Sequence, residues 1–104
     1  MWARPAGAAG FGADKKPLDA YYGCGWMVRP VGDTGKANVW HTGLISGTSA
    51  LLVRRWDGLN WAVLFNTDAD PKGEYPADLI DGPMHTAADA IKAWPERDLS
   101  EPGR

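Results

Sequence analysis

Apolar and polar positions alternate along the middle of the chain with a period of two, which is typical of β-strands whose two faces meet different surroundings. The alternation runs through four segments, at residues 21–29, 38–42, 49–56 and 60–66. Because the connections between these segments are short, the pattern predicts antiparallel strands. Asp57-Gly58 separates the last two segments and predicts a tight hairpin with a type I′ turn, in which both central residues adopt positive φ.

A helix is predicted near the C-terminal end. It opens at Pro83, since proline is favourable at a first helical position where its missing N–H would have no partner, and it ends at Pro95. Its apolar stripe consists of Met84, Ala87, Ala88, Ile91 and Trp94. Residues 67–82 are expected to form a polar loop before it. One helix with one stripe packs on one sheet face, so the pattern predicts an α+β fold with an antiparallel sheet of about four strands and a C-terminal helix.

The two ends of the chain lack this periodicity. Residues 1–20 carry scattered glycines and prolines and are expected to form an irregular N-terminal arm, whereas residues 96–104 are expected to form a polar tail. Residues 21–95 are therefore the predicted globular part. A chain of 104 residues has room for one domain.

Composition removes several classes of function. The chain has 11 basic and 13 acidic residues and a net charge of −2, which argues against a nucleic-acid-binding surface. One cysteine and two histidines leave too few ligands for a protein-built metal centre, so no metal or cofactor is predicted. No apolar run approaches the ~20 residues of a membrane span. The first residues also lack the apolar stretch of a signal peptide, and the compartment stays open.

Two reactive side chains are predicted to have no chemical role. Cys24 alternates with Tyr22 and Trp26 on the apolar face of the first predicted strand, which favours a buried thiol over a nucleophile. His85 lies away from the stripe of the predicted helix and is expected to be a solvated surface histidine.

His41 is a candidate for chemistry, because it stands beside Thr42 at the end of a predicted strand. A sharp turn at Gly43 would leave backbone N–H donors unpaired next to an imidazole and a hydroxyl. Such an arrangement suits an anion or an oxyanion. A strand-end histidine whose hydrogen bonds are all satisfied is the alternative.

Four short motifs follow one another along the predicted strands: Tyr22-Gly23-Cys24-Gly25-Trp26, His41-Thr42-Gly43, the run from Gly47 to Val53 and the run from Asp57 to Asn66. Their order and spacing resemble the C-terminal end of the serine β-lactamase-related hydrolases. This family includes class C β-lactamases, D-alanyl-D-alanine carboxypeptidases and related esterases. The resemblance covers residues 21–94 and implies that they are part of a β-lactamase-like α/β domain.

The resemblance also implies a role for each residue of one strand. In that family a Lys-Thr-Gly strand, which often reads His-Thr-Gly in the carboxypeptidases and esterases, lines the cleft. By resemblance, His41 orients the substrate carboxylate or carbonyl and assists proton movement, and Thr42 hydrogen-bonds the substrate. Gly43 leaves space for it, and the backbone N–H of Leu44 supplies half of an oxyanion hole. The implied reaction is acyl transfer from a small or peptide-like ester, amide or β-lactam to a serine and then to water.

The chain departs from the family at the nucleophile. None of Ser46, Ser49 and Ser100 is followed three residues later by lysine, and the chain has neither Tyr-x-Asn nor Ser-x-Asn. We therefore expect a C-terminal fragment of a serine hydrolase that is inactive alone. Intact members of the family are often exported, which leaves localisation unknown for this chain.

A stand-alone, non-catalytic binding module is the alternative. It would bind a partner by adding a strand to the open edge of its sheet. In either case we expect an exposed sheet, and with it possible self-association.

Overall fold

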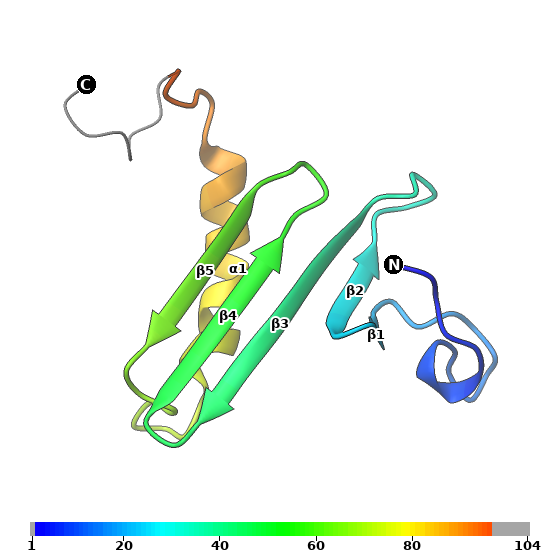
Figure 1. Ribbon diagram of the computed structural model, residues 1–104, viewed down its shortest axis with the longest axis horizontal. Coiled ribbons are helices and arrows are strands. Elements are labelled where there is room, and N and C mark those ends of the chain that lie inside the picture. Colours follow the sequence, from blue (N-terminus) through cyan, green and yellow to red (C-terminus); the bar gives the residue numbers. More distant parts are fainter. Residues whose placement is uncertain (1, 97–104) are drawn as a thin grey trace.

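A computed structural model describes residues 2–96, which form a five-stranded antiparallel sheet and one long helix (Figure 1). The elements are a short 3₁₀ helix η1 (Gly7–Ala9), the strands β1 (Tyr21–Gly23), β2 (Trp26–Pro30), β3 (Ala37–Ile45), β4 (Thr48–Arg54) and β5 (Asn60–Phe65), and the helix α1 (Pro76–Ala90). The strands lie in the sheet in chain order. The α+β class is confirmed, with five strands in place of about four. Apart from its first residue, the predicted polar tail lies outside the described residues.

The first predicted strand is in fact a hairpin. The prediction of one strand over residues 21–29 is wrong, because the chain reverses at Cys24-Gly25, whose φ angles are 52° and 84°. Positive φ at both central residues is what a type I′ turn requires. Cys24 is consequently exposed at the tip of the hairpin, and the prediction of a buried thiol is wrong as well.

Strand β3 is longer than predicted. Gly43 does not turn the chain: it pairs with Ala50, and the strand continues to Ile45. The reversal comes at Ser46-Gly47, where Gly47 has φ 83°. His41 and Thr42 therefore lie in the middle of a strand and not at its end.

The hairpin at Asp57-Gly58 is present with a different turn. Arg55 N–H donates to the carbonyl of Leu59 over 2.8 Å, which encloses a three-residue loop. Gly58 has φ 91°, whereas Asp57 is not among the residues with positive φ. A three-residue loop with one left-handed glycine is the next most common hairpin connection after the two-residue turns.

Helix α1 begins at Pro76 and contains Pro83, so the predicted polar loop is wrong over residues 76–82. It ends at Ala90, and Ile91 and Trp94 lie beyond it. The helix continues past Pro83 because its inner side keeps contact with the sheet, and packing overrides local propensity. Apolar side chains that are fully or partly buried recur along that side: Ala77, Ile80, Met84 and Ala88.

The core has one cluster on each face of the sheet. On the helix side, Leu51 and Val53 of β4 pack with Ala77, together with the partly buried Trp40, Trp61 and Ile80. On the other face, Tyr21, Val28 and Val39 pack with Trp2 of the N-terminal arm. The two clusters are on opposite faces because neighbouring residues of a strand, here Val39 and Trp40, point in opposite directions.

The N-terminal arm is held in place by Arg4. Its guanidinium donates to the carbonyls of Gly10 over 2.9 Å and Leu18 over 2.7 Å, and it lies 4.5 Å from the centre of the Tyr21 ring. Within the described part of the chain, η1 is the only helical turn of this arm.

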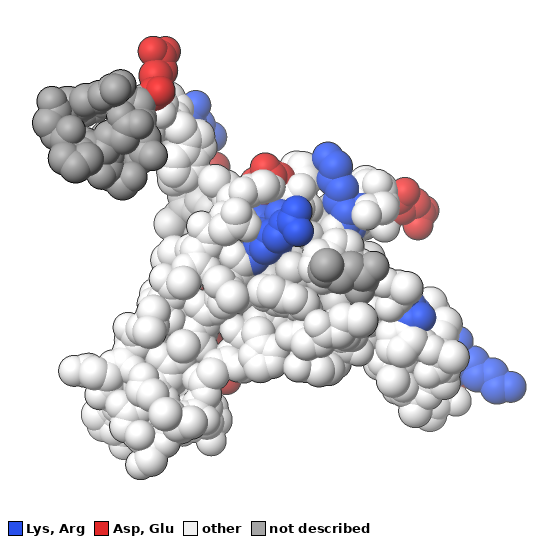
Figure 2. All heavy atoms as spheres, viewed as in Figure 1, with Lys and Arg blue, Asp and Glu red and all other residues white. Residues whose placement is uncertain are grey.

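The face of β3–β5 opposite α1 has no cover among the described residues. Figure 1 shows α1 behind these strands, and Figure 2, in the same view, shows almost no charged side chain over them. Leu64, Ile45 and Leu52 are 77%, 70% and 45% exposed there. Bare apolar faces of this kind are common sites of association, and self-association of this chain stays a prediction.

Candidate functional site

Strand β3 has a neighbour on both sides along only part of its length. Strand β2 pairs with it no further than Trp40, which lies opposite Met27. Strand β4 pairs with it from Val39 to Ile45. Residues 41–45 of β3 therefore have one edge without a neighbouring strand among residues 2–96, and this open edge starts at His41.

The register determines which backbone groups face the open edge. Hydrogen-bonded and non-bonded pairs alternate along antiparallel strands. Val31 N–H donates to the carbonyl of Lys36 over 3.0 Å, one step beyond the last β2–β3 pair, so the even-numbered residues of β3 direct their N–H and C=O groups toward β2. Past the end of β2, these residues are Thr42 and Leu44. The N–H of Leu44 thus faces the open edge because β2 is short, and not because of a turn at Gly43.

His41 makes two hydrogen bonds at this edge. Its Nδ1 is 2.6 Å from the carbonyl oxygen of Thr42, and its Nε2 is 3.0 Å from the hydroxyl of Tyr22. A carbonyl only accepts, so Nδ1 carries the proton, and in the neutral ring Nε2 accepts from Tyr22. The Tyr22 and His41 rings meet edge to face with their centroids 5.8 Å apart.

These contacts limit what His41 can do. The resemblance implies that His41 orients the substrate carboxylate. In the neutral ring, however, the one N–H already donates to the carbonyl of Thr42, so none is left for a carboxylate. Instead, His41 holds the Tyr22 hydroxyl at the edge, and its Nε2 is a base within hydrogen-bonding distance of that hydroxyl. Sequence reasoning missed this contact, because it assigned Tyr22 to an apolar strand face.

A wide groove of about 640 Å³ lies beside this pair. Its lining is mostly apolar and includes Tyr22, Trp26, His41, Thr42, Leu52 and Leu64. A smaller hollow of about 210 Å³ lies between β3 and the start of α1, where Thr42 and Gly43 meet Tyr75 and Asp78. Thr42 and Gly43 line both hollows, which places them between the two spaces open to a ligand.

The serines near this strand show no activating partner. Ser49 is 1% exposed, and its hydroxyl donates to the carbonyl of Thr67 over 3.0 Å. Ser46 is exposed in the turn after β3. Within residues 2–96, no ionisable side chain hydrogen-bonds to either one, and Ser100 lies outside that range. The described part of the chain also gathers no group of three or more metal-ligating side chains.

His85 is not the solvated surface histidine that the sequence predicts. Its ring packs on Trp61 with the centroids 4.9 Å apart and the planes at 78°, and its Nε2 is 3.6 Å from a carboxylate oxygen of Asp81. The inner side of α1 includes His85 beside Met84 and Ala88, whereas Ala87 of the predicted stripe is exposed. It therefore belongs to the helix–sheet contact.

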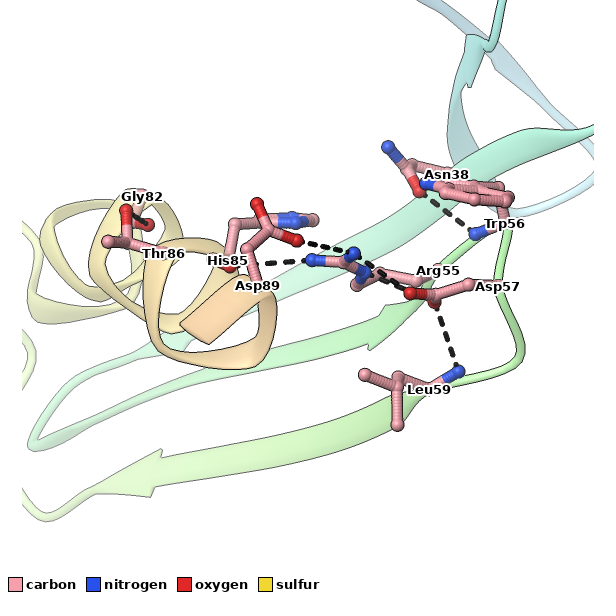
Figure 3. A network of polar contacts seen from close by, with 9 residues as sticks. All are labelled: Asn38, Arg55, Trp56, Asp57, Leu59, Gly82, His85, Thr86 and Asp89. Atoms are coloured by element: carbon pink, nitrogen blue, oxygen red, sulfur yellow. Dashed lines mark hydrogen bonds and ion pairs between the residues drawn. The ribbon is translucent and has the colours of Figure 1, made fainter. Parts of the chain in front are cut away.

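A second polar cluster, also missed from the sequence, joins the β4–β5 hairpin to α1 (Figure 3). Arg55 is 8% exposed. Its Nε and Nη2 donate to the two carboxylate oxygens of Asp57 over 3.1 and 2.8 Å, and Nη2 also donates to Asp89 over 2.7 Å. The hydrogen bonds that Arg55 donates to Asp57 raise the pKa of Arg55 and lower the pKa of Asp57. The arrangement ties the hairpin to the last turns of α1, and its role is structural.

Comparison of the chain with protein families, with curated proteins and with solved structures finds no match. Among the described residues, no helix is long and apolar enough to cross a membrane. The site is therefore defined by its own geometry: an open strand edge, a histidine–tyrosine pair and an apolar groove.

Proposed function

We propose that this chain is the C-terminal part of a serine hydrolase related to the β-lactamases and that it supplies the substrate-binding edge of an acyl-transfer site. The observation that carries the proposal is the open edge of β3. It combines the His41-Thr42-Gly43 motif with backbone N–H groups of Thr42 and Leu44 that pair with no strand within residues 2–96.

An extended acyl substrate would lie along this edge. The N–H groups of Thr42 and Leu44 would donate to its carbonyl oxygens, and one of them would stabilise the oxyanion that forms on attack. A Cβ added at Gly43 would contact only the methyl group of Ala50, at 3.6 Å, so this position has free space beside the groove.

Catalytic turnover would need a nucleophile from outside the described residues. Oxyanion stabilisation without the nucleophile leaves only a residual rate in serine hydrolases. The bare apolar face of β3–β5 supports the same view, because a complete enzyme would cover it with further chain.

The binding half of the proposal is tested on the chain itself. In a titration with N-acetyl-D-alanyl-D-alanine followed by ¹⁵N–¹H NMR, the amides of Thr42 and Leu44 should shift. Gly43→Val should abolish these shifts, because the added side chain fills the space beside the edge. The chain should stay folded, because an added Cβ meets no atom closer than the methyl group of Ala50. Asn60→Ala, on the far edge of the sheet, is the matched control and should bind normally. Shifts confined to β5, or none at all, would refute the proposal.

The catalytic half is tested by mixing the full chain with the N-terminal portion of a β-lactamase-related esterase that ends before its own His-Thr-Gly strand. Continuous turnover of a nitrophenyl ester, with many molecules of nitrophenol released per chain, should appear only in the mixture. His41→Ala should then lower kcat/KM by ~10²–10³-fold if the Tyr22–His41 pair contacts the transition state. Thr86→Ala, an exposed change on α1, should have no effect.

The second candidate function is a strand-binding module, favoured by one observation on β5. Residues 60–65 form an edge strand without charge or proline, and such an edge pairs readily with an added strand. Shifts at the amides of Ala62 and Leu64 on adding an extended apolar peptide would support this function.

A further inference from the structure

We infer that the Tyr22 hydroxyl is an acyl acceptor, which takes up one acyl group from an activated aryl ester without any serine nucleophile. This inference goes beyond the proposed function and does not depend on it. It concerns the chain by itself and rests on the contacts of Tyr22 and His41.

The first step of the argument is the geometry of nucleophile and base. An activated hydroxyl nucleophile lies within about 2.6–3.2 Å of a base, and that base is oriented by a third group. Tyr22 Oη is 3.0 Å from His41 Nε2, and His41 Nδ1 is 2.6 Å from the carbonyl oxygen of Thr42. The carbonyl fixes the tautomer in which Nε2 is free to take a proton.

The second step is access. Tyr22 is 52% exposed, and both Tyr22 and His41 line the wide apolar groove. An aryl ester has a flat apolar leaving group that fits such a surface. Thr42 lines the same groove, and its N–H faces the open edge of β3, where it can donate to a developing oxyanion.

The reaction balances without any further reagent. Tyr22 Oη attacks the ester carbonyl carbon and forms a new C–O bond, while the hydroxyl proton passes to His41 Nε2. The tetrahedral intermediate collapses, the bond to the aryl oxygen breaks, and the aryloxide leaves with the electron pair. His41 then returns its proton to the aryloxide. The product is an aryl ester on Tyr22, so each chain reacts once.

The chain offers a matched control in Tyr75. This tyrosine is 47% exposed, close to the 52% of Tyr22, yet no residue in the described part of the chain hydrogen-bonds to its hydroxyl. A difference in acylation between the two therefore measures the contribution of His41 and not that of exposure. The third tyrosine, Tyr21, is 4% exposed and donates to the carbonyl of Trp2, so it should stay unmodified.

The experiment treats the full chain with p-nitrophenyl acetate and maps acetyl groups by peptide mass spectrometry over time. All proteins carry Cys24→Ser, because the exposed thiol would compete. We expect a single burst of nitrophenol and acetylation of Tyr22 about 10²-fold faster than of Tyr75, the lower end of what a positioned base contributes.

Two variants separate the base from the nucleophile. Tyr22→Phe should abolish the burst, and His41→Gln, which keeps a hydrogen-bonding side chain but no base, should slow Tyr22 to the rate of Tyr75. Both positions are exposed, and far-UV circular dichroism should show an unchanged fold. Equal rates at Tyr22 and Tyr75, or a His41→Gln variant that reacts as the parent does, would overturn the inference. The NMR titration and the mixing experiment described above would still test the proposed function independently.

Discussion

Replacing Arg55 with methionine tests whether the hairpin and the helix depend on one buried cation. Methionine keeps an unbranched apolar stem but removes every donor to Asp57 and Asp89. Hydrogen bonds to a charged group contribute about 1.5–3 kcal/mol. The bond to Asp89 adds little, because that side chain is 66% exposed and such pairs contribute about 0–1 kcal/mol. Relief of the desolvation of Arg55 offsets part of the loss, so the expected decrease in unfolding free energy is about 2 kcal/mol.

Urea unfolding followed by far-UV circular dichroism measures this decrease. For a domain of this size, about 2 kcal/mol corresponds to a Tm lower by about 8–16 °C. Arg54→Met is the matched control: Arg54 is the preceding residue, it is exposed, and it makes no ion pair with any residue in 2–96, so its loss should stay within about 0.5 kcal/mol. Equal losses for Arg54→Met and Arg55→Met, at an unchanged m-value, would refute the structural role of the Arg55 cluster.

Three further predictions follow from the same structure. The hydrogen bonds from Arg55 lower the pKa of Asp57 in the folded state, so their contribution is complete above the ordinary aspartate pKa of about 3.9 and is lost as pH falls through the folded value below it. Asp57→Asn should thus reduce stability at pH 7 and lose its effect in acid, as urea titrations would show. In hydrogen exchange, the amides of Thr42 and Leu44 should exchange much faster than that of Gly43, which faces β4; equal protection would contradict the assigned register. Finally, Leu64→Lys should reduce self-association in analytical ultracentrifugation, and an unchanged sedimentation profile would exclude the bare face as its cause.

The strands that the sequence predicts best are those with a strict alternation between a covered and an uncovered face. In β4, Leu51 and Val53 are buried against α1, whereas Leu52 and Arg54 are exposed, and this difference is visible in the sequence as a period of two. The hairpin to β5 was predictable because Asp57-Gly58 separates two alternating segments. Its turn was not, because a short Asp-Gly segment fits both a two-residue and a three-residue loop.

The start of α1 at Pro76 could not be predicted, because the composition of its first turns is typical of a loop. Residues 76–82 include two aspartates and a glycine, which together with Pro83 indicate a loop more strongly than a helix. Only contact with the sheet selects the helix here, since Ala77 is 3% exposed and packs on Leu51 and Val53. The same contact turns His85 toward Trp61, which the apolar stripe alone could not indicate.

The candidate site was predictable in part. The motif drew attention to His41 and Thr42, but their partner Tyr22 lies on β1, which is not a neighbour of β3 in the sheet. A contact between non-adjacent strands depends on how the intervening turn folds the chain. That turn contains Cys24 at φ 52°, a conformation rare for any residue other than glycine, asparagine or aspartate, so local sequence gave little sign of it.

The turn at Cys24-Gly25 accounts for two features of the site, the open edge of β3 and the contact between Tyr22 and His41. In the register of β2 with β3, where Met27 lies opposite Trp40, an uninterrupted strand would place Gly25 opposite Thr42 and Gly23 opposite Leu44. The N–H and C=O groups of Thr42 and Leu44 would then pair with that strand, and no open edge would remain for a ligand. Because the chain reverses instead, the edge stays open and Tyr22 is carried back to within hydrogen-bonding distance of His41. The hairpin turn, and not a residue of β3 itself, is therefore what creates both the unpaired donors and the base-linked hydroxyl.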